Sequence, residues 1–168
     1  MRKFGVPTLI IRAASEDHVD SIFASIMGIA RHVKEEHKVK STRDDLAQAL
    51  FGPKPILEGV VAEIDEEYAG MCLFFRSYST WLGAPGVYIQ DLWVDEAARH
   101  KRVGERLLQH VAALTRMRGG IYMRLSVDTQ NFPAMRFYER LGLEHSDTEQ
   151  VHAAYGDAFQ ALADGATR

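Results

Sequence analysis

The stretch Val94–Leu108, "VDEAARHKRVGERLL", runs from the end of an apolar strand through a basic turn into an amphipathic helix. Free backbone N–H groups at a helix start, together with the helix dipole, favour a bound anion. Gly104, just after the turn, allows a bulky ligand to approach the backbone closely. On its own the stretch fits equally well a phosphate site and a solvated turn that closes a β-α unit.

Before this stretch, the period of the hydrophobic pattern separates strands from helices. Alternating or β-branched runs predict four strands, over residues 8–13, 58–65, 67–80 and 86–94. Two helices are expected between the first two strands, over residues 15–33 and 41–52. Their expected caps are Ser15 for the first helix, Ser41 or Thr42 for the second, and Gly52 at the end of the second. We interpret the last three strands as an antiparallel meander.

After the quoted stretch, the pattern predicts a helix over 103–120, a strand over 121–129 and a helix over 131–142 capped by Asn131. The tail is expected to add a strand around Gln150–Tyr155 and a short final helix. The order predicts an α/β fold with a mixed, mostly antiparallel sheet flanked by helices. A right-handed β-α-β crossover is expected near its centre.

Length and composition narrow the class of protein. The 168 residues predict one domain over 1–168, with its core over about 8–162. A formal net charge of −3 disfavours a general nucleic-acid binder. The chain has no apolar run of about 18 residues, so we expect no membrane span. Cys72 is the only cysteine and no His-x-x-x-His pair lies on a strong helix, so we expect a cytoplasmic protein without a disulfide or a metal.

The basic turn and four other segments resemble one known family. Arg99 to Gly104 resembles the Arg/Gln-x-x-Gly-x-Gly/Ala signature of the GNAT family of acyl-CoA N-acetyltransferases. The segments "IRAASEDHVDSI", "YIQDLWVDEAAR", "VGERLLQHV" and "NFPAMRFYERLGLE" resemble other parts of that family, in the same order. The resemblance runs from about Leu9 to about Leu162. Within the family, "RSYSTWLG", "VYIQDLWV" and "NFPAMRFYERLG" are most similar to the diamine (spermidine/spermine) and thialysine acetyltransferases.

This resemblance implies a GNAT fold whose central β-α-β unit binds acetyl-CoA. The co-substrate is expected in a V-shaped gap between the strands Tyr88–Val94 and Ile121–Val127, with its pyrophosphate on the basic turn. The residues implied to bind it lie at the end of the central strand, in the turn and on the following helix, and on the helix after Asn131. They are Leu92, Trp93, Val94, Arg99, His100, Lys101, Arg102, Val103, Gly104, Glu105, Asn131, Ala134 and Tyr138.

Transfer of an acetyl group to an amine needs a neutral amine and a protonated or stabilised thiolate. Tyr138 matches the general-acid tyrosine of the family, and we expect it to serve as the catalytic acid. Helix periodicity alone instead favours a core aromatic beside Phe137. The catalytic interpretation of Tyr138 is therefore supported by its match to the family motif, and not by helix periodicity.

The sequence departs from the family at two positions. Arg102 replaces the first glycine of the turn, and it either weakens acetyl-CoA binding or adds a charge-assisted contact. Gln90 replaces the glutamate that helps to accept the amine proton, and glutamine cannot accept one at ordinary pH. Asp91 follows it, and strand alternation predicts that its side chain lies on the opposite face. Other possible proton acceptors are His32, Glu35, Glu36, His145 and His152, or an ordered water that passes the proton to solvent.

We therefore expect an N-acetyltransferase that acts on a primary amine of a small molecule, polyamine-like or lysine-like. The substrate contacts expected are His32, Gln90, Asp91 and Arg124. Alternatives are a protein N-terminal or aminoglycoside-type acetyltransferase and a catalytically silent acyl-CoA-binding module. A homodimer is implied by the resemblance, because the tail of similar proteins packs across a two-fold partner. Nucleic acid and membrane are not expected as partners.

Overall fold

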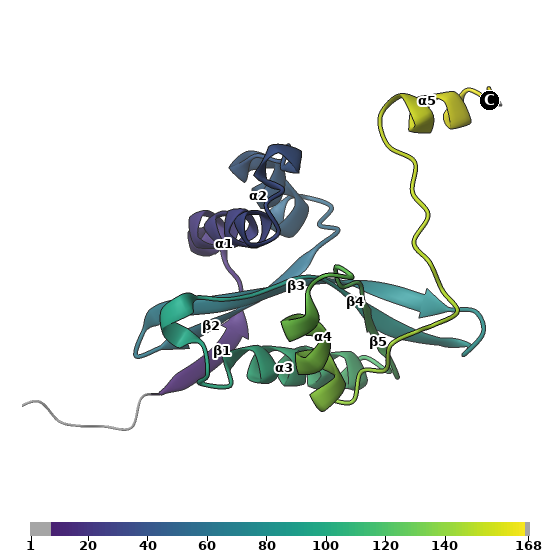
Figure 1. Cartoon of the computed structure of the whole chain (residues 1–168). Helices are drawn as coiled ribbons and strands as arrows, with labels where there is room; N and C mark the ends of the chain where they lie inside the picture. The colour runs from purple at the N-terminus through teal and green to yellow at the C-terminus, as the bar shows by residue number, and fades with distance from the viewer. Residues whose placement is uncertain (1–7, 167–168) are drawn as a thin grey trace, which may run out of the picture. The chain divides into compact units, whose positions relative to one another are not determined.

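Five strands form a single sheet in the order β1-β2-β3-β4-β5 in the computed structural model, which describes residues 8–166 (Figure 1). They are β1 (Leu9–Ala13), β2 (Glu58–Ile64), β3 (Glu67–Ser79), β4 (Ala84–Val94) and β5 (Met123–Leu125). The strands from β1 to β4 pair antiparallel, whereas β4 and β5 pair parallel. The predicted mixed, mostly antiparallel sheet is confirmed.

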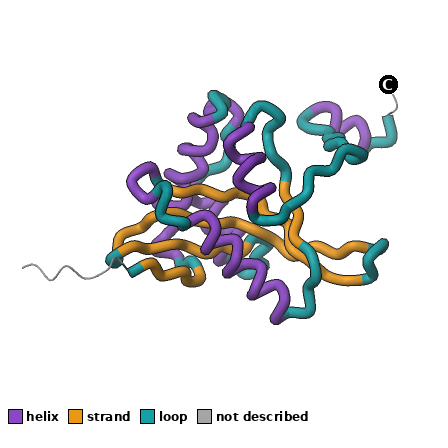
Figure 2. Tube along the Cα trace, turned by 60° about the horizontal axis from the view of Figure 1, so that its bottom comes forward, coloured by secondary structure: helices purple, strands orange, loops and turns teal. Residues whose placement is uncertain are grey.

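Helices cover both faces of this sheet. The helices α1 (Val19–His32) and α2 (Arg43–Phe51) lie on one face, and α3 (Val103–Met117) lies on the other (Figure 1). Figure 2 shows the strands as a layer between these helices. Because α3 connects the parallel strands β4 and β5, it is the helix of the predicted β-α-β unit. Within residues 8–166, none of the helices combines the length and the apolar character needed to cross a membrane.

The core on the α1 and α2 face is built mainly from apolar side chains. Six buried side chains form it: Ile22, Leu46, Leu50, Val61, Met71 and Leu73. Strand alternation sends the neighbours Cys72 and Phe74 to the α3 face, where Leu107 and Val111 are also buried. The Cys72 thiol is fully buried, and burial raises its pKa, so this cysteine is a packing residue and not a nucleophile.

The ends of the first two helices follow local capping signals. Thr42, one of two predicted caps, accepts a hydrogen bond at Oγ1 from the N–H of Asp45 at 3.2 Å, and Gly52 ends α2 as predicted. Ser15 precedes a single 3-10 turn, Glu16–His18, so α1 itself begins four residues after Ser15, at Val19. The buried His18 ring faces back to Ser15, with 2.8 Å between Nδ1 and Oγ.

The central strand β4 carries one residue more than β3 opposite it. Leu73 pairs with Asp91 and Phe74 with Ile89, which leaves Gln90 as the extra residue of a β-bulge. The parallel pairing with β5 stops at the same point, at the pair Ile89 and Leu125. From Asp91 to Val94, β4 pairs within the described sheet only with β3.

This bulge corrects the predicted length of the last strand. The sequence predicted a strand over 121–129, whereas β5 covers only Met123–Leu125. The β-branched and apolar pattern continues beyond Leu125, but β4 bends away at Gln90 and supplies no further partner. A strand needs such a partner for its hydrogen bonds, which is why the prediction was wrong at the C-terminal end. At the other end, the N–H of Ile121 donates to the Pro85 carbonyl and the Tyr122 carbonyl accepts from Val87, but neither residue is part of β5.

The chain forms two compact units, one ending at Asp128 and one beginning at Thr129. The second unit holds α4 (Phe132–Arg140) and α5 (Asp157–Ala163). Asn131 caps α4 as predicted, since its side chain accepts a hydrogen bond from the N–H of Ala134 at 3.2 Å. The predicted short final helix is confirmed as α5. The strand expected around Gln150–Tyr155 is wrong, because no described strand pairs with this segment and it stays extended and exposed.

Gly28 on α1 is required by the packing of a β4 side chain. A Cβ at this position would lie 2.7 Å from Cζ2 of Trp93. We expect Gly28→Ala to lower the free energy of unfolding by about 1–3 kcal/mol through overpacking, although alanine normally stabilises a helix interior. Urea unfolding in a Trp81→Phe background, where Trp93 is the only tryptophan, measures stability and Trp93 packing together when tryptophan is excited selectively.

The contrasting variant is Gly83→Ala, at a turn glycine with φ of +63° and no heavy atom within 4 Å of a Cβ. It is expected to cost only backbone strain, about 1 kcal/mol, and to leave the Trp93 emission unchanged. Equal emission and equal or greater stability in Gly28→Ala would show that the Trp93 contact is not tight.

Candidate functional site

The basic turn between β4 and α3 has the backbone shape of a glycine-rich loop. After a 3-10 turn over Glu96–Ala98, His100 has φ of +65° and Arg102 has φ of +61°. This left-handed region is normally occupied by glycine and costs other residues about 1–2 kcal/mol. Arg102 therefore takes a backbone conformation that normally favours glycine.

The first turn of α3 leaves backbone donors at the end of this loop. The first helical hydrogen bond runs from the N–H of Arg106 to the carbonyl of Arg102, at 3.0 Å. The N–H groups of Val103, Gly104 and Glu105 precede that bond, at the positive end of the helix dipole. The loop shape and these donors fit a phosphate group.

The Arg102 side chain is paired with Glu105 and makes no described contact with these backbone N–H groups. Its guanidinium makes two hydrogen bonds with the Glu105 carboxylate, from Nε to Oε2 at 2.9 Å and from Nη2 to Oε1 at 2.6 Å. Gln109, one turn further along α3, donates to the same carboxylate at 3.0 Å. The hydrogen bonds from Arg102 lower the pKa of Glu105, so this carboxylate stays ionised. The arginine therefore lies along the side of the helix.

The other cations of the turn are arranged separately. The Arg99 guanidinium lies over the ring of Trp93, 5.5 Å from its centroid, and Nη1 is 3.7 Å from Oε1 of Glu96. His100 and Lys101 are exposed beside it. These side chains thus place positive charge around the turn, and none of their described contacts is with the backbone N–H groups at the start of α3.

The end of β4 lies open on its β5 side. Leu92, Trp93 and Val94 follow the bulge, where the parallel pairing has ended. The two strands are still linked before the bulge, where the Tyr88 hydroxyl lies 2.7 Å from the Ser126 hydroxyl. Backbone groups of the strand end thus have no partner strand on the β5 side of the described sheet.

Asp91 pairs with a residue of the core on the α1 and α2 face. That residue is Leu73, which unbroken alternation would have paired with Gln90 instead. Burial raises the pKa of Asp91, and no hydrogen bond or cation among the described residues offsets that effect. Gln90 itself is exposed.

A break in the sequence pattern marks this pair. "YIQDLWV" places two polar residues side by side in the middle of an apolar strand. Strict alternation allows one of them on each face, whereas a bulge allows both on one face. The two adjacent polar residues were the sequence signal for a bulge at Asp91. The prediction used strand alternation alone and did not include a bulge.

The remaining substrate and base candidates lie elsewhere in the first unit. His32 is exposed in the last turn of α1, Glu35 forms an ion pair with Lys38 at 2.6 Å, and Glu36 begins a 3-10 turn. Arg124 lies on β5, in register with Tyr88. The structure does not bring these side chains together with Asp91 in any contact that it describes.

The second unit positions the expected acid on α4. Asn131, Ala134 and Tyr138 are three and four residues apart, so they share one face of the helix. All three are half-buried, and the Tyr138 ring meets Phe137 edge-on, with 5.2 Å between centroids.

In the tail, His145 lies 3.0 Å from Asp147, and His152 follows in the extended segment. Across residues 8–166, no group of three or more His, Cys, Asp or Glu side chains is arranged to hold a metal.

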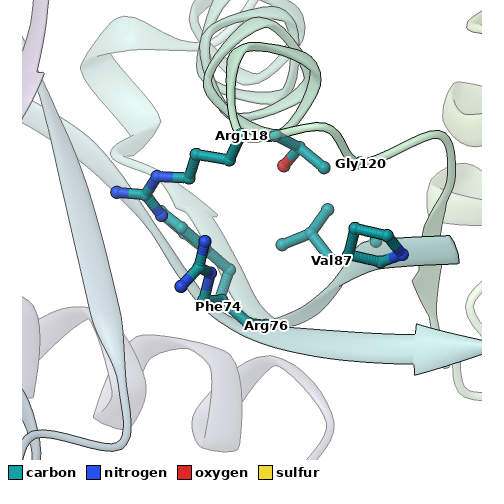
Figure 3. A pocket seen from close by; sticks show the side chains of 8 residues that line it. Phe74, Arg76, Val87, Arg118 and Gly120 are labelled. Atoms are coloured by element: carbon teal, nitrogen blue, oxygen red, sulfur yellow. The ribbon is translucent and has the colours of Figure 1, made fainter.

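A small pocket lies at the opposite end of α3 from the basic turn. Its lining includes Arg76 on β3, Val87 on β4, and Arg118 and Gly120 after the helix (Figure 3). Arg118 donates to Glu58 at 2.7 Å, so its charge is already paired. This pocket is therefore separate from the site built by the β4 end and the start of α3.

Comparison with known sequences finds one family and several enzymes. The model of the acetyltransferase (GNAT) family matches residues 20–143. Thialysine N-epsilon-acetyltransferase of Bos taurus is 31% identical over 166 residues, which cover 92% of this chain and 97% of that protein. L-ornithine N5-acetyltransferase of Arabidopsis thaliana is 32% identical over 128 residues, covering 76% of this chain and 53% of that protein.

Solved structures agree in fold. An integron cassette protein from the mobile metagenome of V. cholerae superposes with a TM-score of 0.76 at 19% identity, covering 92% of this chain and 97% of the other. An aminoglycoside acetyltransferase from a soil metagenome, solved with sisomicin, gives a TM-score of 0.69 at 18% identity, covering 88% and 95%. At these identities the likeness establishes the fold alone.

Proposed function

Because the chain belongs to the GNAT family of acetyltransferases and is an N-acetyltransferase, we propose that it transfers the acetyl group of acetyl-CoA to a primary amine of a small molecule. The observation that carries the proposal is the turn before α3. His100 and Arg102 take left-handed conformations there and leave the N–H groups of 103–105 ahead of the helical ladder. This arrangement fits the pyrophosphate of acetyl-CoA.

The acceptor proposed first is a lysine-like amine, at the end of a short alkyl chain. The names of two relatives support this class, since one acts on thialysine and the other on L-ornithine. Polyamine-like amines come second, because Gln90 replaces the glutamate of the polyamine-type relatives. This chain shares the fold of an aminoglycoside acetyltransferase only at 18% identity, which favours no aminoglycoside.

The reaction forms a C–N bond and breaks the C–S bond of the thioester. The amine loses one proton, and the departing thiolate gains one. We assign proton acceptance to Asp91 and thiolate protonation to Tyr138. Support for Asp91 is its place beside Gln90 on the bulge and its pKa, which burial raises toward the useful range. Support for Tyr138 is its place in the family motif, on the face of α4 that also carries Asn131.

We also propose that the enzyme is a cytoplasmic homodimer. The tail supports the dimer, because its large apolar side chains are exposed in the described chain: Val151, Tyr155, Phe159 and Leu162. Such residues usually find a partner surface. The lone, buried cysteine supports the reducing compartment.

Calorimetric titration tests the binding half of the proposal. We expect acetyl-CoA and free CoA to bind at one site per chain with Kd near micromolar, or about −8 kcal/mol. Thiol release should then occur with lysine, thialysine or ornithine, and more slowly with spermidine. Binding without turnover on any of these amines would reject the acceptor class, and absence of CoA binding would reject the proposed function itself.

A further inference from the structure

We propose that Arg102 and Glu105 act as one neutral, ion-paired unit that allows an arginine to replace glycine in the turn. In this arrangement the pair neither covers nor charges the backbone donors at the start of α3. Glu105 is thus a positioning residue, which acts on acetyl-CoA binding through Arg102. The inference rests on the proposed function, because it concerns the site that would hold the pyrophosphate.

The geometry of the pair supports this role. Arg102 directly precedes α3 and Glu105 lies in its first turn, three residues later. The guanidinium nitrogens Nε and Nη2 donate to separate oxygens of Glu105. Such two-point pairing fixes the direction of the guanidinium as well as its distance. Gln109 holds the Glu105 carboxylate from the next turn, so the pair extends along the helix and away from its first N–H groups.

The backbone explains why the side chain needs a partner. Arg102 takes φ of +61°, a conformation that favours glycine, so its Cβ and long side chain begin directly beside the proposed anion site. The Arg102 side chain is 74% exposed and that of Glu105 only 19%, so the carboxylate is the fixed member of the pair. Without Glu105, the arginine would be free to lie over the donors.

The charges give the proposal its test. Arg102 alone adds one positive charge beside the phosphates, and Glu105 alone adds one negative charge there. Together they cancel, and removing both leaves the local charge unchanged. Binding of CoA should therefore depend on whether the pair is balanced, and not on whether the arginine is present.

Four proteins separate these effects: the parent, Arg102→Gly, Glu105→Gln and the double variant. Free CoA is titrated calorimetrically into each at low and at high salt. We expect Arg102→Gly to bind about fivefold more weakly, because it leaves an unpaired carboxylate beside the phosphates, with a smaller loss at high salt. We expect Glu105→Gln to bind about fivefold more weakly as well, because the released arginine covers the backbone donors. The double variant should return to within about twofold of the parent, since its local charge is again balanced.

Two results would overturn the inference while leaving the proposed function intact. A double variant as weak as Arg102→Gly would make Arg102 itself a phosphate ligand. Tighter binding by Arg102→Gly would make the arginine an obstruction. If the parent binds no CoA, the proposed function fails and the inference with it. Arg116→Gln, at the far end of α3, controls for net charge, and thermal melting checks that each variant is folded.

Discussion

Asp91→Asn is expected to lower kcat by at least about a hundredfold and, at the same time, to raise the melting temperature. Asparagine keeps the size of the side chain but cannot accept a proton. The gain in stability follows from burial, which raises the pKa of Asp91 above its value in the unfolded chain. At neutral pH the ionised carboxylate therefore costs folding free energy, and asparagine removes that cost.

The sign of this effect fixes its pH dependence. A raised pKa means that the folded protein holds its proton more tightly than the unfolded chain. The parent should therefore gain stability relative to Asp91→Asn as the pH falls through the folded pKa. The difference should vanish below the unfolded pKa, near about 4. Denaturant unfolding at pH 7 and at low pH measures both limits.

A rescue experiment distinguishes a base from a packing residue. Gln90→Glu in the Asp91→Asn background places a carboxylate on the neighbouring bulge position and should recover part of kcat. Asp44→Asn, at an exposed site in the first turn of α2, should change neither activity nor the pH dependence. Full activity in Asp91→Asn would show that another group or water accepts the proton of the amine.

Features with a local cause were predictable from the sequence. The runs over 58–65 and 67–80 became β2 and β3 with ends within one residue, because continuous apolar runs between turn residues mark strands that are buried on both faces in their middle. Thr42 and Asn131 cap their helices because each side chain needs only the N–H groups of its own helix. The β-α-β unit followed from the order of these elements.

Features that depend on a neighbouring strand were not predictable in the same way. The bulge at Gln90 exists only relative to β3, and it decides both the length of β5 and the direction of Asp91. The tail shows the same limit, since Gln150–Tyr155 has the pattern of a strand but no described strand beside it. Alternation marks a chain that can pair, whereas the pairing itself is a property of two segments.

Arg102 shows how a departure from a motif can leave its geometry intact. The sequence left open whether an arginine at a glycine position weakens the turn or strengthens it. The structure keeps the left-handed backbone and places the side chain on Glu105, three residues further along. The identity of residue 102 alone was therefore not enough to predict the geometry of the turn. The residue that pairs with the arginine, Glu105, lies in the helix that follows.

Tyr138→Phe is expected to lower kcat by about a hundredfold while the Kd for CoA stays within about twofold. Phenylalanine keeps the ring and its edge-on contact with Phe137, so α4 should pack as before. The lost hydroxyl removes the proton donor for the departing thiolate. Steady-state kinetics with the best amine and a calorimetric titration with CoA measure the two quantities separately.

The matched control for this change is Tyr155→Phe, which removes the hydroxyl of a tyrosine that is 82% exposed in the tail. It should leave kcat unchanged. The solvent deuterium isotope effect on kcat should also fall in Tyr138→Phe, because a proton donor no longer moves with the breaking C–S bond. Normal turnover in Tyr138→Phe would show that Tyr138 is a packing residue and not the catalytic acid. A parallel loss of CoA binding would instead make the hydroxyl a binding contact, since a pure acid acts only as the thiolate leaves.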